Sequence, residues 1–108
     1  MKTALKYLTL AVVLLLPSTV FAQASLTGAV RDASGGVLPG VTVEAASPAL
    51  IEKVRTAVTD GSGQYRIVDL QPGTYALTFT LPGFNVVKRE DVQLTGNQTL
   101  TIPIEMRV

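Results

Sequence analysis

Apolar and polar residues alternate along most of the chain, and the clearest alternation runs from Thr74 to Leu81. One face carries Tyr75, Leu77, Phe79 and Leu81, and the other carries Thr74, Ala76, Thr78 and Thr80. A period of two with aromatic and β-branched residues is typical of a half-buried strand. Pro72-Gly73 is a turn signal before it, and Tyr65 and Ile67 alternate with polar residues ahead of that turn. The stretch 60–81 therefore predicts a β-hairpin whose aromatic residues point into a core.

One residue of this hairpin does not follow the alternation. Leu70 would lie on the face opposite to Tyr65 and Ile67 if the strand were regular. One extra residue in a strand shifts the following side chain to the other face. We therefore expect a bulge near Val68-Asp69 that returns Leu70 to the core.

Further short alternating segments occur on both sides of the hairpin, with turn residues every 8–12 positions. These segments are 26–31, 41–45, 55–59, 92–94 and 100–106. A loop or single turn is expected at 47–53, with Leu50 and Ile51 covering one end of the core. The charges from Lys88 to Asp91, and Pro103 in the last segment, predict edge strands. The pattern as a whole predicts a seven-stranded antiparallel β-sandwich.

The N-terminus has a different pattern. Lys2 and Lys6 precede an unbroken apolar run from Leu8 to Leu16, and small residues follow up to Ala22 and Ala24. This order is typical of a secretory signal peptide, and the run is about half of the ~20 residues that a membrane span needs. We expect residues 1–22 to form a signal-peptide helix, with cleavage after Ala22 or Ala24. The exported domain is then 23–108.

Composition limits the chemistry of this domain. The sequence has no Cys and no His, which removes the common zinc sites and the Ser-His and Cys-His nucleophile systems. No base is recognisable near Ser25, Ser34, Ser47 or Ser62. No cluster of Lys and Arg indicates a nucleic acid or an anionic membrane surface as partner. We expect no enzyme activity, and no catalytic, cofactor-binding or metal-binding residue.

Two features could still bind a ligand. The loop Asp60-Gly61-Ser62-Gly63 could hold calcium or phosphate, but it lacks the carboxylates of an EF-hand and the lysine of a P-loop, so a β-turn is favoured. Aromatic residues could stack on a sugar. Alternation assigns Tyr65, Tyr75 and Phe79 to the core and leaves Phe84, beside a turn, open.

The order of five motifs resembles the carboxypeptidase regulatory-like domain and covers nearly all of the exported chain. They are Thr27-Gly28-x-Val30-x-Asp32, Gly36-Val37-Leu38-Pro39-Gly40-Val41-Thr42-Val43, Val58-Thr59-Asp60-x-x-Gly63-x-Tyr65-x-Ile67, Leu70-x-Pro72-Gly73-Thr74-Tyr75 and Pro82-Gly83-Phe84. The resemblance implies a non-catalytic, transthyretin-like Greek-key sandwich, a fold also grouped with carbohydrate-binding-like domains.

The sequence of residues 47–84 resembles the version of this domain that lies at the N-terminus of TonB-dependent outer-membrane receptors. In such receptors the signal peptide is followed by this domain, a plug and a β-barrel, which matches the order at the start of this chain. The resemblance implies the N-terminal fragment of a transport receptor in the periplasm and outer membrane of a Gram-negative-type bacterium. Its partner would be the plug or barrel or another envelope protein, with membrane contact only through the signal peptide or a C-terminal barrel. The alternatives are a carbohydrate-binding module with a glycan partner, and a free-standing periplasmic structural or adhesive domain.

Overall fold

The computed structural model describes residues 23–50 and 54–108. The predicted signal peptide 1–22 and the predicted core residue Ile51 lie outside this part. The described residues form eight strands: β1 Ala24–Asp32, β2 Thr42–Ala46, β3 Val54–Val58, β4 Gln64–Leu70, β5 Gly73–Thr80, β6 Val87–Leu94, β7 Thr99–Thr101 and β8 Ile104–Met106. In these two ranges no helix has the length and apolar character needed to cross a membrane.

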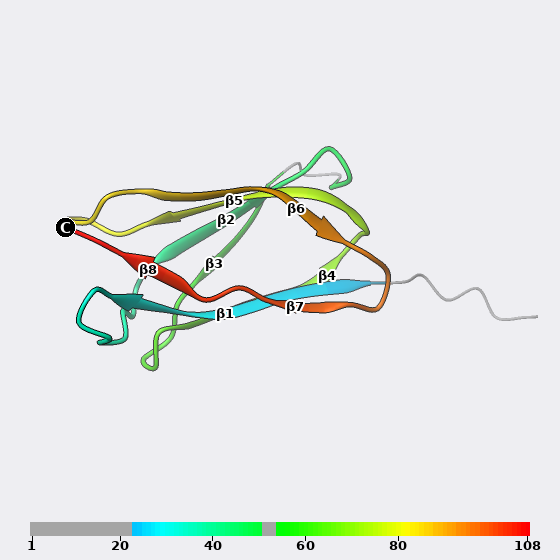
Figure 1. The fold of residues 1–108 in the computed structure, drawn as a ribbon. Coiled ribbons are helices and arrows are strands. Elements are labelled where there is room, and N and C mark those ends of the chain that lie inside the picture. Colours follow the sequence, from blue (N-terminus) through cyan, green and yellow to red (C-terminus); the bar gives the residue numbers. More distant parts are fainter. Residues whose placement is uncertain (1–22, 51–53) are drawn as a thin grey trace, which may run out of the picture.

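The strands form two facing sheets, so the protein is the all-β sandwich that the sequence predicts (Figure 1). One sheet has the order β4-β1-β7, with β8 also paired to β1, and the other has the order β3-β2-β5-β6. The predicted last strand is divided into β7 and β8 between Thr101 and Ile104. Counting these two as one interrupted strand gives the expected seven.

The direction of this last strand differs from the antiparallel expectation. The pairings β1–β4, β2–β3, β2–β5 and β5–β6 are antiparallel, but β7 and β8 both run parallel to β1. Alternation reports only which side chains share a face, and it is the same for either direction of a strand. The parallel pairing therefore lies beyond what the pattern can indicate.

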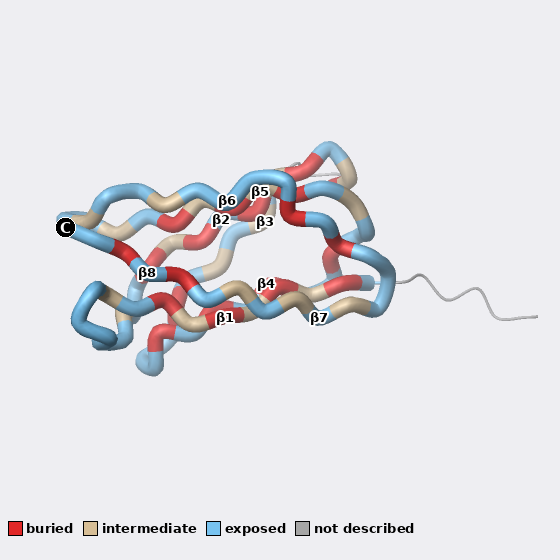
Figure 2. The backbone as a smooth tube through the Cα atoms, viewed as in Figure 1, coloured by how far each residue is buried: buried red, intermediate tan, exposed pale blue. Residues whose placement is uncertain are grey.

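Buried residues alternate along the strands, as Figure 2 shows, and they fill the space between the sheets. The largest fully buried side chains include Tyr65, Tyr75 and Phe79. The ring of Tyr65 meets that of Phe79 edge-on, with centroids 5.4 Å apart. These burials confirm the predicted core face of the hairpin.

Two bulges reset the alternation. Ala24 pairs with Leu70 and Leu26 with Ile67, so β4 contains the extra residue that was predicted near Val68-Asp69, and Leu70 is fully buried. Asp69 has a φ of 59°. A second bulge lies on β6, where Asp91 has a φ of 57°. This second bulge explains why the charged stretch before Val92 shows no regular alternation.

The predicted turn after β2 is also present. The Ser47 hydroxyl oxygen accepts a hydrogen bond from the Ala49 amide at 3.1 Å, and the Leu50 amide donates to the Ser47 carbonyl. Leu50 is buried, as expected. The edge positions predicted for the charged segment, now β6, and for the Pro103 segment are confirmed by the strand order.

Candidate functional site

Three connecting segments and the C-terminal residues meet at the end of the sandwich where β1 finishes. The connecting segments are 32–41, 59–64 and 81–86, and the C-terminal residues are 106–108 (Figure 1). The Asn85 amide donates to the Arg107 carbonyl at 2.7 Å, and the Val30 amide donates to the Gly63 carbonyl at 2.8 Å. We call this end of the molecule the loop end. It holds the loop Asp60–Gly63, the ligand-loop alternative considered above, and several of the sequence motifs.

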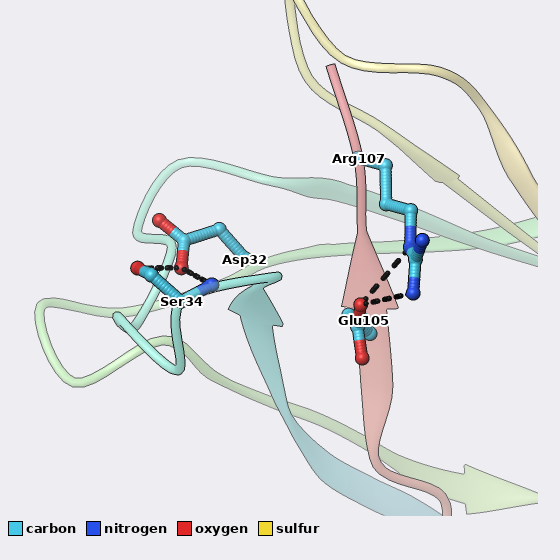
Figure 3. Close-up of polar contacts among 4 residues, drawn as sticks. All are labelled: Asp32, Ser34, Glu105 and Arg107. Atoms are coloured by element: carbon cyan, nitrogen blue, oxygen red, sulfur yellow. Dashed lines mark hydrogen bonds and ion pairs between the residues drawn. The ribbon is translucent and has the colours of Figure 1, made fainter.

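The turn after β1 is organised by one carboxylate oxygen. Oδ1 of Asp32 accepts hydrogen bonds from the Ser34 hydroxyl at 2.6 Å, the Ser34 amide at 3.0 Å and the Gly36 amide at 2.9 Å (Figure 3). The Ser34 hydroxyl bond is the main cause that lowers the pKa of Asp32 below its ordinary value. The carboxylate therefore closes the turn as an anion.

A second turn repeats this arrangement. Oδ1 of Asp60 accepts from the Ser62 hydroxyl at 2.7 Å, the Ser62 amide at 2.9 Å and the Gln64 amide at 3.0 Å. The same bonds, led by that of the Ser62 hydroxyl, lower the pKa of Asp60. The favoured β-turn interpretation of this loop is confirmed. No group of three or more potential metal-ligating residues occurs in 23–50 and 54–108.

The two turns share the pattern Asp-x-Ser-Gly, at 32–35 and at 60–63. This repeat is the sequence signal for the first turn, which alternation marks only as the end of the segment 26–31. In both turns the serine hydroxyl donates to the aspartate. Neither serine has a histidine to activate it, and a carboxylate of lowered pKa is a weak base. The Asp-Ser pairs therefore serve the turns.

Thr59 connects this end of the molecule internally. Its side chain is buried; its hydroxyl donates to the Leu38 carbonyl at 2.7 Å and accepts from the Val41 amide at 2.8 Å. Next to it, Gly63 has a φ of 75°, and a Cβ there would come within 3.0 Å of Val30, Val37 and Leu38 atoms. These contacts explain the Thr-Asp-x-x-Gly motif by folding alone. The role of Thr59 could not be predicted from the sequence, because its partners are about twenty residues away.

A third cluster joins the C-terminal strand to β1. The Tyr65 hydroxyl donates to the Ile102 carbonyl at 2.7 Å, and the Ile102 amide donates to the Thr27 carbonyl at 2.9 Å. Gly28 lies directly under the Ile102 carbonyl, and a Cβ at Gly28 would collide with it. Burial raises the pKa of Tyr65 to about 12, against a smaller opposite effect of Arg89. We call this cluster the Gly28–Tyr65–Ile102 joint.

Tyr75 fixes the turn between β4 and β5. Its ring is buried, and its hydroxyl donates to the Gln71 carbonyl, four residues upstream, at 2.6 Å. A tyrosine that bonds back across a corner between strands in this way is a known device of β-sandwiches. Tyr65, Tyr75 and Phe79 are thus used in the core and cannot stack on a sugar at the surface.

Phe84 is the remaining aromatic candidate. It is partly buried and lines an open depression of about 420 Å³ at the loop end, together with Asp32, Ala33, Ser34, Met106, Arg107 and Val108. Arg107, one of these lining residues, forms an exposed ion pair with Glu105 at 3.0 Å (Figure 3). The lining residues include a carboxylate, a hydroxyl and an aromatic ring. It brings together no nucleophile and base.

The chain is similar to proteins of known sequence and of known structure. The chain is 41% identical over 95 residues to the TonB-dependent transporter Oar of Myxococcus xanthus, which covers 86% of the chain and 9% of that transporter. The chain thus spans only a small part of this relative. Among solved structures, the Bacillus anthracis TIE protein matches 80% of the chain and 16% of its own chain, with a TM-score of 0.65 and 16% identity.

A chain of a type II cohesin–X–dockerin complex from Acetivibrio cellulolyticus matches 77% of this chain and 56% of its own, with a TM-score of 0.60 and 25% identity. The profile of the carboxypeptidase regulatory-like domain matches residues 25–107, which include the Asp turns, the Gly28–Tyr65–Ile102 joint and the Tyr75 corner. The chain belongs to the carboxypeptidase regulatory-like domain family.

Proposed function

We propose that this chain is an exported, non-catalytic accessory domain at the N-terminus of a TonB-dependent outer-membrane receptor, where it contacts or positions other envelope proteins during transport. The observation that carries the proposal is the 41% identity to a TonB-dependent transporter of which the chain covers 9%. A domain that matches so small a share of a transporter fits the role of an accessory module. The transport activity itself would reside in the rest of the parent protein.

The extent of the alignment supports the N-terminal position. It takes in 86% of the chain, which is more than residues 25–107 contain, so it also includes residues before Ser25. These residues adjoin the predicted cleavage positions Ala22 and Ala24. The relative therefore shares part of the segment that we interpret as a signal peptide.

The use of polar residues supports a non-catalytic role. Asp32, Asp60 and Thr59 all direct their side-chain oxygens to backbone groups of nearby turns. These motif residues therefore stabilise turns. This use is consistent with a function in which the domain contacts other proteins through its surface. Nothing in the described residues favours the glycan alternative, since three of its four aromatic candidates are buried.

Reading the DNA beyond codon 108 tests the proposal most directly. We expect the reading frame to continue into a plug and a barrel. A stop codon at this point, followed by an unrelated gene, would contradict the receptor assignment.

Export is tested separately with the full 108-residue chain, tagged at the C-terminus and produced in a Gram-negative host. The periplasmic product should have the mass of a chain cut after Ala22 or Ala24. The control Val13→Arg interrupts the apolar run and should leave the chain uncut and outside the periplasm. A wild-type chain that keeps its full mass would overturn the export part of the proposal.

A further inference from the structure

The two sheets have four edges, and three of them carry features that discourage pairing with another strand. β4 has the bulge at Asp69, β6 has a bulge at Asp91 within four consecutive charged residues, and the last strand is divided beside Pro103. Bulges, charges and proline are the usual means by which proteins protect sheet edges. The fourth edge, β3, is different.

β3 presents a regular edge whose exposed residues, Val54, Thr56 and Val58, carry no charge. Its five residues pair with β2 in an unbroken register, from Val54 opposite Ala46 to Val58 opposite Thr42. Val54 is 44% exposed and Val58 is 59% exposed. The single charge of the strand, Arg55, reaches towards β4, where it donates to the Val68 carbonyl at 3.0 Å. β3 thus lacks the protection seen on the other edges.

The hydrogen-bond pattern shows which backbone groups of β3 face outwards. The Thr59 amide donates to the Val41 carbonyl at 3.0 Å, and the Thr59 carbonyl accepts from the Gly40 amide at 3.1 Å, so both backbone groups of Thr59 point to the segment that leads into β2. Along an antiparallel strand, every second residue directs its backbone groups to the same neighbour. Ala57 and Arg55 therefore direct their amide and carbonyl groups to β2. Those of Val54, Thr56 and Val58 point away from the sheet, on the side where no strand within 23–50 and 54–108 pairs with β3.

The sequence of this edge is complementary to itself. When two copies of Val54-Arg55-Thr56-Ala57-Val58 run antiparallel with Thr56 opposite Thr56, each Val54 lies opposite a Val58 and each Arg55 opposite an Ala57. Valine pairs and threonine pairs are favourable across strands, and like charges opposite each other are not. Within these five residues, the register sets no like charges opposite each other.

We infer that β3 is a self-association site, at which a second copy of this chain pairs antiparallel about a two-fold axis at Thr56. Each of Val54, Thr56 and Val58 exchanges both backbone hydrogen bonds with the other copy. The exposed valines of both copies gather on one outer face, and Arg55 keeps its bond to Val68. The contact is small, so the association is weak in solution. Within a membrane, two anchored parent receptors would meet at higher effective concentration.

Sedimentation equilibrium of the purified exported chain at concentrations up to about 1 mM tests this inference, because contacts of this size bind weakly. Thr56→Lys and Thr56→Asp each place two like charges opposite one another at the axis. Each variant alone should associate at least about tenfold more weakly than the wild type. An equimolar mixture of the two should associate again at low salt, because Lys then lies opposite Asp.

Thr80→Lys is the matched control. Thr80 is an exposed threonine of the same sheet, but it lies on β5, away from the β3 edge. This variant should associate like the wild type, and circular dichroism should show that all variants are folded. Recovery in the mixture supports the two-fold pairing at Thr56. The proposed pairing would be overturned by a wild-type chain that stays monomeric, or by Thr56 variants that associate as the wild type does. The partner of this edge would then be an extended segment of another protein.

Discussion

The Gly28–Tyr65–Ile102 joint and the β3 edge differ in burial and in how many motif residues they contain. Gly28 and Tyr65 of the joint are buried and Ile102 is partly buried, every polar group named in it has a partner, and it contains residues by which the family is recognised. The β3 edge is exposed, and of the motif residues it holds only Val58. The residues of the family motifs therefore mainly stabilise the fold. A role in contact is better sought on surfaces that the motifs do not mark.

The strongest test of this contrast is Tyr75→Ala. It removes a buried ring and the hydroxyl bond that fixes the corner at Gln71. We expect a loss of about 3–5 kcal/mol in the free energy of unfolding, measured by urea denaturation. The control Val58→Thr alters an exposed side chain of β3 and should change stability by less than about 0.5 kcal/mol. A loss below about 1 kcal/mol for Tyr75→Ala would mean that the corner is not part of the stabilising core.

Gly28→Ala should have the next largest effect. The added Cβ would collide with the Ile102 carbonyl and would come within 2.8 Å of the Tyr65 hydroxyl, so the C-terminal strand must shift. Overpacking of this kind costs about 1–3 kcal/mol. Gly61→Ala is the matched control, since a Cβ there meets nothing within 4 Å. Equal stabilities of the two variants, measured by thermal unfolding, would argue against close packing at the joint.

Tyr65→Phe is a milder change of the same joint. It removes only the hydroxyl that donates to the Ile102 carbonyl, which should cost about 1–2 kcal/mol near neutral pH. The pKa of Tyr65, raised to about 12 by burial, makes this difference depend on pH. The folded state keeps its phenol proton between pH 10 and 12 while the unfolded state loses it. The contribution is therefore complete below pH 10 and is lost as the pH rises towards 12.

The measurement for this variant is the free energy of unfolding against pH from 8 to 12 in both proteins. The wild type should lose stability more steeply than Tyr65→Phe above pH 10, because only the wild type titrates at this position. Parallel curves would show that Tyr65 is not buried against the C-terminal strand.

The smallest effect is expected at the Asp turns. Asp60→Ala removes the acceptor of three hydrogen bonds at an exposed site, and it should lower the melting temperature by a few degrees. Since the folded pKa of Asp60 is lowered, its contribution is present above the ordinary pKa of 3.8 and is lost as the pH falls below it. The difference from wild type should therefore shrink in acid. A difference that is unchanged at pH 2 would contradict the role of the carboxylate anion.

Local pattern was enough to predict much of the fold. Alternation gave the buried faces of β4 and β5, and the misplaced Leu70 gave the bulge at Asp69, because both depend on neighbours in sequence. The parallel direction of β7 and β8 could not be predicted. It depends on the contact of Ile102 with Gly28 and Tyr65, which are tens of residues away and carry no charge or motif that names their partner.

The surface features were harder to foresee. Thr56 and Val58 share one face of the predicted segment 55–59, but alternation alone does not say whether that face is exposed. In the structure that face is exposed, and the Arg55 side chain lies on the opposite face, where it donates to the Val68 carbonyl of β4. Of the two Asp turns, only the one at Asp60 was considered as a ligand loop from the sequence. Its hydrogen bonds show that the carboxylate oxygen is used within the turn.

Amide NMR spectra of the exported chain over a concentration series test the central claim, that the motif residues hold the fold while the β3 edge makes contacts. With increasing concentration, the amide signals of Val54, Thr56 and Val58 should shift, and those of Gly28, Asp32 and Asp60 should stay in place. Shifts confined to the loop end, with β3 unchanged, would contradict the account.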